Sequence, residues 1–493
     1  MKLLLPVLLP IFAGILVLLS KGLRKKRTSL TAFAAFILAV EASLVLWAVW
    51  EESSVVLFSL TNTLTIAFHV DSIGRLFAVL TVVMWLLVGI YAMAYMKHEH
   101  EEHKFFGYYL IVTGILIGLD FSSNLITMYV FYELMTLTSL PLVLHERTKE
   151  AVQAGLKYLF YSVAGAFFAL FGIFFLASVC SSLEFVPGGV LAGEAVAGKE
   201  GLLLTAACCM IIGFGTKAGM FPFHGWLPTA HPVAPAPASA VLSGVITKAG
   251  VLAVIRVIYY IIGQDLIRGT WVQTVWVVLS LATVFMGSML AYKEHVLKKR
   301  LAYSTVSQVS YIMFGLSLLE PTAFVGALSH VVFHSIIKNG LFMTAGAIIV
   351  TTGWTRVEQM RGLGRIMPFT LAGYTVLSLA LVGIPPASGF VSKWYLATGA
   401  MASGVGVWAF VGPVVLLISA LLTAGYLLPV TIQGFFPGKD FDDSELKKRK
   451  LLKREPALFM LGPILLLAAV ALLLGCFPGS LIQMVQSIGA LAL

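Results

Sequence analysis

Charge is what this 493-residue sequence has least of. Only 11% of its residues are charged, whereas 59% are hydrophobic and the mean hydropathy is +0.95. A soluble domain carries roughly 25% charged residues, and so few charges could not cover the surface of a water-soluble protein of this size. The composition therefore excludes a soluble enzyme, a DNA-binding protein and a secreted disulfide scaffold. It predicts a chain whose surroundings are mostly lipid.

Cysteine and nucleotide-binding motifs are also scarce. The four cysteines form no C-x-x-C pair of the kind that favours an iron–sulfur or zinc site, and no Walker A or Rossmann glycine pattern is present. The run His98–His103 is more typical of a solvated loop than of a metal site. We therefore expect no cofactor, no metal and no redox or catalytic centre in this chain. Whether it is a subunit of an oxidoreductase complex stays open.

Long apolar runs are abundant instead. A bilayer core needs about 20 apolar residues per helix, and the first run is interpreted as a retained helix because no clear small-x-small cleavage site appears. The sequence thus predicts an all-α polytopic membrane protein of about fourteen spans. They lie near 3–20, 29–50, 73–96, 105–120, 122–144, 150–179, 201–223, 237–262, 271–291, 301–319, 322–350, 368–398, 405–436 and 457–478.

The basic residues are distributed unequally among the connecting loops. If the first helix starts outside, the predicted cytoplasmic loops hold 23 of the 33 lysines and arginines, and the outer segments hold only Lys2, Lys199 and Arg268. This pattern predicts a multi-pass protein of the cell (inner) membrane with both termini outside. The clusters Lys21–Arg27 and Lys447–Arg454 are then topology determinants, with binding of lipid headgroups or a partner as the alternative.

A few ionisable residues fall within the spans, where their burial is costly and marks functional paths by default. We expect Arg75, Lys157 and Glu41 to extend to the membrane interface, and Arg256 to be a structural or interface charge. The remaining candidates for function are Glu133, Lys217, Lys248, Lys338 and Lys393.

Two predicted helices are interrupted by glycine and proline at matching positions along the chain. They are Gly213–Pro222, which contains Lys217, and Gly383–Lys393. Such breaks at matching positions of two halves indicate a transport site, because they free carbonyls that can hold water or ions. The predicted organisation is a three-helix N-terminal segment, two five-helix repeats, and a basic cytoplasmic loop with a last helix, at residues 1–104, 105–262, 271–436 and 437–493.

Glu133 lies in the middle of a span and needs a partner there. Lys217 is the candidate, because an ion pair lowers the cost of burial for both groups. Withdrawal of the glutamate would favour release of the lysine proton, so the pair would be a switchable proton site.

The histidines leave several alternatives open. His330, His334 and Lys338 recur at intervals of four and form one polar stripe on a helix. A proton relay suits histidine, haem ligation would need rings opposed across a gap, and both could be core histidines. Five residues near the two breaks would either control water access or form contacts, such as hydrogen bonds, with the exposed backbone there: His224, His231, Pro222, Pro385 and Pro386.

The order of these motifs resembles the antiporter-like subunits shared by Mrp-type cation/proton antiporters, membrane-bound hydrogenase-type complexes and respiratory complex I. The run around Lys393, Ser-Lys-Trp-Tyr, is most similar to the D-type Mrp subunit and its hydrogenase counterpart. The matching pieces are Phe131–Glu133, Lys217 with Phe221–His231, Ala234–Ala240 before Lys248, His330–Lys338, Gly362–Pro368 and Gly383–Lys393.

The resemblance implies fourteen helices with two inverted five-helix repeats. It also implies a proton-translocating subunit of a multi-subunit complex, either an Mrp-type antiporter or a redox-driven ion pump related to complex I. Other membrane subunits, lipid and protons would be its partners, nucleic acid would not, and the involvement of sodium stays open. The implied roles are a modulating pair of Glu133 and Lys217, a central relay at Lys248, a bridge of His330, His334 and Lys338, and a terminal site at Lys393.

A stand-alone sodium/proton or solute secondary transporter is the alternative function. The sequence leaves open the type of complex, its subunit composition and the direction of transport.

Overall fold

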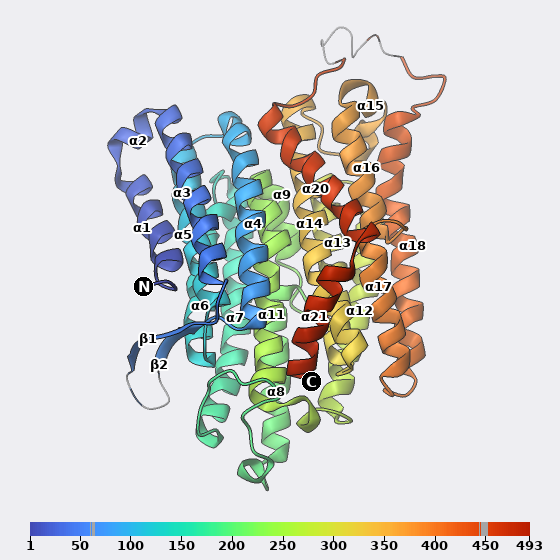
Figure 1. Cartoon of the computed structure of the whole chain (residues 1–493). Helices are drawn as coiled ribbons and strands as arrows, with labels where there is room; N and C mark the ends of the chain where they lie inside the picture. The colour runs from blue at the N-terminus through green and yellow to red at the C-terminus, as the bar shows by residue number, and fades with distance from the viewer. Residues whose placement is uncertain (60, 62–64, 443, 445–451) are drawn as a thin grey trace.

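A computed structural model describes residues 1–59, 61, 65–442, 444 and 452–493 of the chain. The described chain is almost entirely helical, and its long helices run side by side as a bundle (Figure 1). Among these residues, ten helices are long and apolar enough to cross a membrane. The predicted class is thereby confirmed in its main part, as a mostly helical fold with candidate membrane spans. Three shorter helices are apolar as well: Leu5–Leu19, Pro368–Val382 and Gly479–Ala492.

The N-terminal segment combines helices with a hairpin that was not predicted from the sequence. Its two strands are antiparallel, with Val55 opposite Phe68 and an irregularity between Val56 and Phe58. Asp71 then begins the next helix by accepting the amide of Gly74. The elements are α1 (Leu5–Leu19), α2 (Lys21–Lys25), α3 (Arg27–Ala48), β1 (Ser54–Ser59), β2 (Thr65–His69), α4 (Ser72–Tyr95) and η1 (Met96–His98).

The next group of helices contains the first break. Asn124 and Thr148 begin α6 and α7 with side-chain caps. Helix α8 ends at Gly219, whose φ of 80° suits glycine, and the helix resumes at Leu227. The elements are α5 (Glu102–Asp120), α6 (Leu125–Val143), α7 (Lys149–Val179), η2 (Gly193–Val196), α8 (Glu200–Ala218), α9 (Leu227–Val233), α10 (Ala236–Val241), the π-helical η3 (Leu242–Ile246), α11 (Thr247–Val257), the π-helical η4 (Ile258–Ile262) and η5 (Gln264–Leu266).

The remaining helices contain the second break. Helix α16 ends at Gly383, with a φ of 91°, and α17 begins at Ser388, so this interruption lies where the sequence placed it. The elements are α12 (Trp271–Lys293), α13 (Leu297–Ser317), α14 (Pro321–Thr352), η6 (Val357–Met360), α15 (Leu363–Ile366), α16 (Pro368–Val382), α17 (Ser388–Ala402), α18 (Trp408–Phe435), α20 (Leu458–Cys476) and α21 (Gly479–Ala492).

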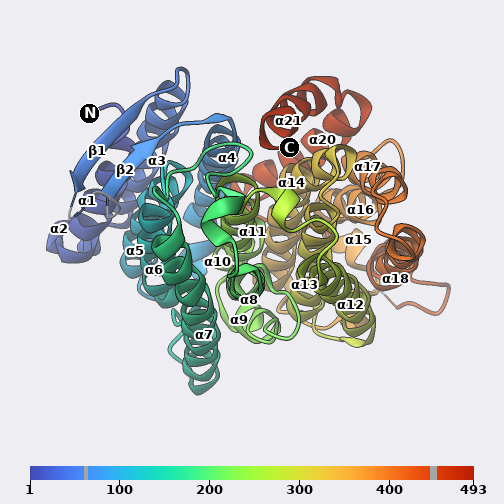
Figure 2. The same ribbon diagram turned by 90° about the horizontal axis from the view of Figure 1, so that it is seen from below.

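Two helical segments form the centre of the bundle. The apolar stretch within Ala236–Ile262 is completely enclosed and that of α14 is 89% enclosed, whereas α3, α18 and α20 bury only a third of theirs. Figure 2 shows α11 and α14 surrounded by the other helices. Polar side chains on these two elements are therefore separated from lipid by the rest of the chain.

Two expectations about charged residues need correction, and a third falls partly outside the described residues. Glu41 does not reach the interface, since it is fully buried in α3 and neither carboxylate oxygen has a partner among the described residues. Lys298 and Arg300, counted above as loop charges, are buried because α13 begins earlier than predicted. Of the cluster Lys447–Arg454, residues 447–451 lie outside the described residues.

Candidate functional site

Lys217 lies in the last turn of α8, just before the first break, and only 1% of it is exposed. Its Nζ donates to Thr136 Oγ1 at 2.9 Å, Tyr158 OH at 3.0 Å and Ser162 Oγ at 2.9 Å. An ammonium has three donors, so three hydroxyl groups from α6 and α7 satisfy it completely. The ring of Tyr158 adds a cation–π contact, with Nζ 4.4 Å from its centroid.

Glu133 does not form the direct pair with Lys217 that was predicted. Among the ion pairs within 4.0 Å in the described part of the chain, none joins these two residues. The donors of Lys217 are already taken by hydroxyls, one of them on Thr136, a single turn beyond Glu133 on α6. The two charges still act on each other through space.

Glu133 is also less enclosed than expected. It is half-buried at the edge of an exposed apolar face of α6 that includes Val130, Leu134 and Leu137. Its Oε1 atom is nevertheless buried and has no hydrogen-bond partner among the described residues. The carboxylate therefore lies between the interior of the chain and its outer surface.

Lys248 and His334 meet in the centre of the bundle. Nζ of Lys248 on α11 lies 2.7 Å from Nδ1 of His334 on α14, and it also donates to the carbonyl of Ser243 at 2.6 Å. Ser243 belongs to the π-helical turn η3, which leaves its carbonyl directed at the lysine. Gly250, two residues further along α11 than Lys248, lets the backbone of α8 near Lys217 approach tightly.

A series of neighbouring polar side chains, called the polar chain below, runs from Lys248 through His334, His330 and Ser392 to Lys393 at the second break. The rings of His334 and His330 stack with centroids 5.8 Å apart, and Nδ1 of His330 lies 2.8 Å from Ser392 Oγ. Lys393 follows in sequence and donates to the carbonyls of Leu381 and Val382, at 2.7 and 2.9 Å. These are among the last carbonyls of α16, where a cation also interacts favourably with the helix dipole.

The geometry of the histidines bears on the haem alternative. Their rings stack on one another from one helix and are not opposed across a gap, so the pair does not form a bis-histidine haem site. The Nε2 atoms of His330 and His334 are both buried and have no partner among the described residues. Buried polar atoms of this kind call for water or for a transferable proton.

Lys338 forms a branch of this polar chain. Its Nζ donates to the carbonyl of Leu301 at 2.8 Å and to the hydroxyl of Ser304, both on α13. Its Nζ also lies 5.7 Å from the centroid of the Phe342 ring. His231, on α9 just after the first break, stacks on the same ring. His231 therefore belongs to the buried centre and not to an outer mouth.

The other residues near the breaks are separated from this centre. His224 is half-buried between α8 and α9 and stacks on Phe221. Pro222, Pro385 and Pro386 are exposed. Of the five residues predicted to control water access, the structure thus places four near the surface and only His231 inside.

Several residues of the polar chain were missed from the sequence. The sequence did not single out the hydroxyl residues around Lys217, or Ser304 and Ser392, as parts of the site. Serine and threonine are common in these spans, so their presence alone indicates nothing. Lys298 had a signal, its positive charge, but was assigned to a loop. It donates to the carbonyls of Pro232 and Ala234, where α9 and α10 meet.

Arg256 has the structural role expected for it. It forms two hydrogen bonds to the carboxylate of Asp71, at 2.5 and 2.7 Å, and its guanidinium lies over the rings of Phe185 and Tyr260. The pair connects α11 to the start of α4, because Asp71 is also the cap of that helix.

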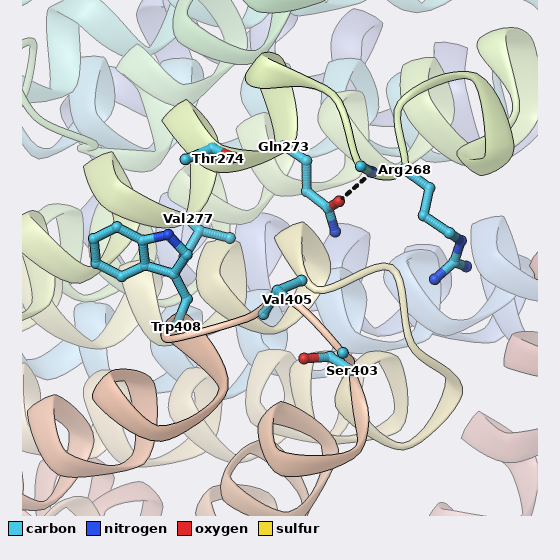
Figure 3. A pocket seen from close by; sticks show the side chains of 9 residues that line it. Arg268, Gln273, Thr274, Val277, Ser403, Val405 and Trp408 are labelled. Carbon is cyan, nitrogen blue, oxygen red and sulfur yellow. Dashed lines mark hydrogen bonds between the residues drawn. The ribbon is translucent and has the colours of Figure 1, made fainter.

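A separate cavity of about 330 Å³ lies where α12 begins and the loop before α18 passes (Figure 3). Gln273 accepts the amide of Gly269 at its wall. Of the described residues lining it, Arg268 alone is charged, and its guanidinium points away from Trp408. This cavity contains none of the buried lysines or histidines.

Comparison with known proteins concerns the chain as a whole. Residues 122–422, more than half of the chain, match the family model described as "NADH:quinone oxidoreductase/Mrp antiporter, TM", and residues 58–106 match "NADH-Ubiquinone oxidoreductase (complex I), chain 5 N-terminus". An NADH-quinone oxidoreductase subunit N from Desulforudis audaxviator is 32% identical over 84% of this chain and 82% of its own.

Two further relatives extend the comparison. The D-type Na(+)/H(+) antiporter subunit of Bacillus subtilis is 29% identical over 88% of this chain and 86% of its own. A chain in the solved structure of the Mrp complex from Dietzia sp. is 25% identical and superposes with a TM-score of 0.83, over 99% of this chain and 97% of that one. The chain therefore belongs to the NADH:quinone oxidoreductase/Mrp antiporter family of membrane proteins.

Proposed function

We propose that this chain is a proton-translocating, antiporter-like subunit of a multi-subunit membrane complex. The observation that carries the proposal is the hydrogen bond between Lys248 and His334, which joins α11 to α14. Helix α11 packs on the first broken helix at Gly250, and α14 contacts the second broken helix through His330 and Ser392. The Mrp complex and the relatives that are themselves subunits support the assembly into a complex.

In the first half, Lys217 would hold a proton among three hydroxyls. Glu133 would modulate it through space, since movement of this carboxylate relative to the lysine changes their attraction without breaking a contact. From Lys217 the proton would pass to Lys248 through water, across the close packing of α8 and α11 at Gly250.

In the second half, the proton would move along α14 and end at α17. Lys248 would pass it to Nδ1 of His334, and one water molecule would connect the unpartnered Nε2 atoms of His334 and His330. Ser392 would then carry it to Lys393 at the end of α16. Lys338, held by α13, would tune this path by its charge.

The finer topology belongs to the same proposal. Fourteen crossings would comprise the N-terminal segment 1–104, inverted repeats at 105–262 and 271–436, and a last crossing within 437–493. Both repeats would then contain one broken helix, as α8–α9 and α16–α17 suggest. In Figure 1 the chain begins at the lower end of α1, below α2, and ends at the lower end of α21, which supports an even number of crossings. The termini would lie outside the cell.

Reconstituted complex in vesicles tests the proposal. Lys217→Ala and Glu133→Ala should each abolish ion translocation while leaving assembly intact, and the exposed Lys199→Ala variant should behave as wild type. Normal proton and sodium flux in either of the first two variants would refute the proposal. The alternative of a stand-alone sodium/proton or solute transporter would instead show full flux with this chain as the sole protein in the vesicle.

A further inference from the structure

A large apolar groove lies outside the polar chain, on the face of the bundle that α4 shares with α20 and α21. Its volume is about 720 Å³. Figures 1 and 2 show α4 on the same side of the molecule as α20 and α21, with α14 behind them. The apolar wall includes Leu46, Leu80, Val83, Val332, Val470 and Leu481. The proposed proton path does not use this groove.

Among the described residues that line the groove, Arg75 is the one with a charge. It lies in the first turn of α4, and its Nε is buried without a hydrogen-bond partner among the described residues. Asp71, four residues earlier, has the right spacing for an ion pair with it. Both oxygens of that carboxylate are occupied by Arg256, however. The guanidinium of Arg75 therefore lies against an apolar wall, and no carboxylate of the described part of the chain forms an ion pair with it.

The residues at one end of the groove are typical of a membrane surface. Trp50 lines it and is 82% exposed, and tryptophan prefers the interface between headgroups and acyl chains. Trp50 follows the end of α3 at Ala48, and Arg75 lies in the first turn of α4, which begins at Ser72. The wall then continues along α14 to Val332 and Ile336, in the middle of that helix.

We propose that this groove binds one anionic phospholipid. Its phosphate would pair with Arg75, because the planar guanidinium fork matches phosphate oxygens, and its acyl chains would cover the apolar wall. Basic pockets between membrane helices select anionic headgroups in the same way. The lipid would join α4 of the N-terminal segment to α20 and α21 at the other end of the sequence.

Lipid retention by the delipidated full-length chain tests this site. Native mass spectrometry should show one tightly held phosphatidylglycerol, weak retention of phosphatidylcholine and no retention of glycerol 3-phosphate, which lacks the acyl chains. Arg75→Gln should weaken phosphatidylglycerol retention about fivefold, since one basic residue near an anionic lipid contributes about 1 kcal/mol. Arg75→Lys should keep most of it, and Arg268→Gln, at another surface, should keep all of it.

A second variant separates lipid binding from folding. Val83→Trp places a large ring in the groove from a side chain that is already 38% exposed. It should displace the lipid while leaving the thermal midpoint in lipid-free detergent unchanged. Equal retention of phosphatidylglycerol by wild type, Arg75→Gln and Val83→Trp would overturn the proposal. So would a benzophenone at position 83 that crosslinks to a partner polypeptide, and not to lipid, in the intact complex.

Discussion

The Nζ atom of Lys248 lies 2.7 Å from Nδ1 of His334, which joins a lysine of α11 to a histidine of α14 in the centre of the bundle. The two residues are 86 positions apart, and both are shielded from solvent. Because they share one hydrogen bond, a change in the protonation of either residue acts directly on the other.

Replacement of His334 by alanine should slow proton translocation on the order of 10²-fold, because Lys248 loses its titratable acceptor. Proton flux into vesicles, normalised to the amount of assembled complex, measures this effect. Ser335→Ala is a matched control on α14, because the Ser335 hydroxyl donates its hydrogen bond to the carbonyl of Val331 on the same helix. Unchanged turnover in the His334 variant would favour a core histidine.

Lys393 should be needed for both stability and transport, and two substitutions separate these roles. Lys393→Met leaves the carbonyls of Leu381 and Val382 without their donor and should destabilise the chain by about 1–2 kcal/mol. Lys393→Arg keeps the charge and should restore the thermal midpoint. It should not restore proton flux, because a guanidinium does not release its proton. Flux in the arginine variant would contradict a protonation role.

The hydroxyls around Lys217 should control the rate of proton transfer through the first half of the path. Tyr158→Phe keeps the ring below the ammonium but removes one acceptor, and Ser162→Ala removes another. A hydrogen bond to a charged group contributes about 1.5–3 kcal/mol, so each change should lower flux roughly tenfold or more. Thr113→Val, which removes a buried hydroxyl on α5 away from Lys217, is the control. Equal rates in all three variants would exclude this role.

The ion pair between Asp71 and Arg256 should make stability depend on pH. Burial raises the pKa of the Asp71 carboxyl, but the charge and hydrogen bonds of Arg256, with the amide of Gly74, lower this pKa more, so that it lies below its ordinary value. Such a group stabilises the fold above its unfolded pKa of about 3.9, and this contribution is lost as the pH falls through the folded pKa.

The midpoint of thermal unfolding, measured across acidic pH, checks this dependence. We expect it to fall below about pH 4 in the wild type and to change less in Asp71→Asn. The variant should also be less stable by about 3–5 kcal/mol near neutral pH, since it leaves Arg256 buried without its counter-charge. A wild type and variant with the same pH profile would show that the pair does not stabilise the fold.

Much of the fold follows from the sequence, because one-dimensional patterns determine it. Every predicted apolar span contains a helix, and the two breaks lie at Gly219 and Gly383, where glycine can adopt a positive φ. The hairpin of β1 and β2 and the helix α21 were not predicted, since both are short elements beyond the spans. The early start of α13 was missed because Lys298 and Arg300 resemble loop charges.

The candidate site was predictable only in part, for a physical reason. A spacing of four places His330 and His334 on one helix face, and positions within apolar spans identified the buried lysines. Spacing within one helix does not show which side chains of other helices converge on a lysine. The acceptors of Lys217 come from α6 and α7, so tertiary packing replaced the expected carboxylate with hydroxyls.

The buried lysines share partners that carry no negative charge. Hydroxyls surround Lys217, a carbonyl and an imidazole hold Lys248, and carbonyls receive Lys338 and Lys393. Among the described residues, no ion pair joins any of the four to a carboxylate.

Each arriving proton would therefore add an unbalanced charge in a medium of low dielectric constant and repel the next one. Loading should then be sequential, and transfer across the full membrane field would be electrogenic, at about 2.3 kcal/mol per 100 mV. We expect turnover to slow as the opposing membrane potential rises.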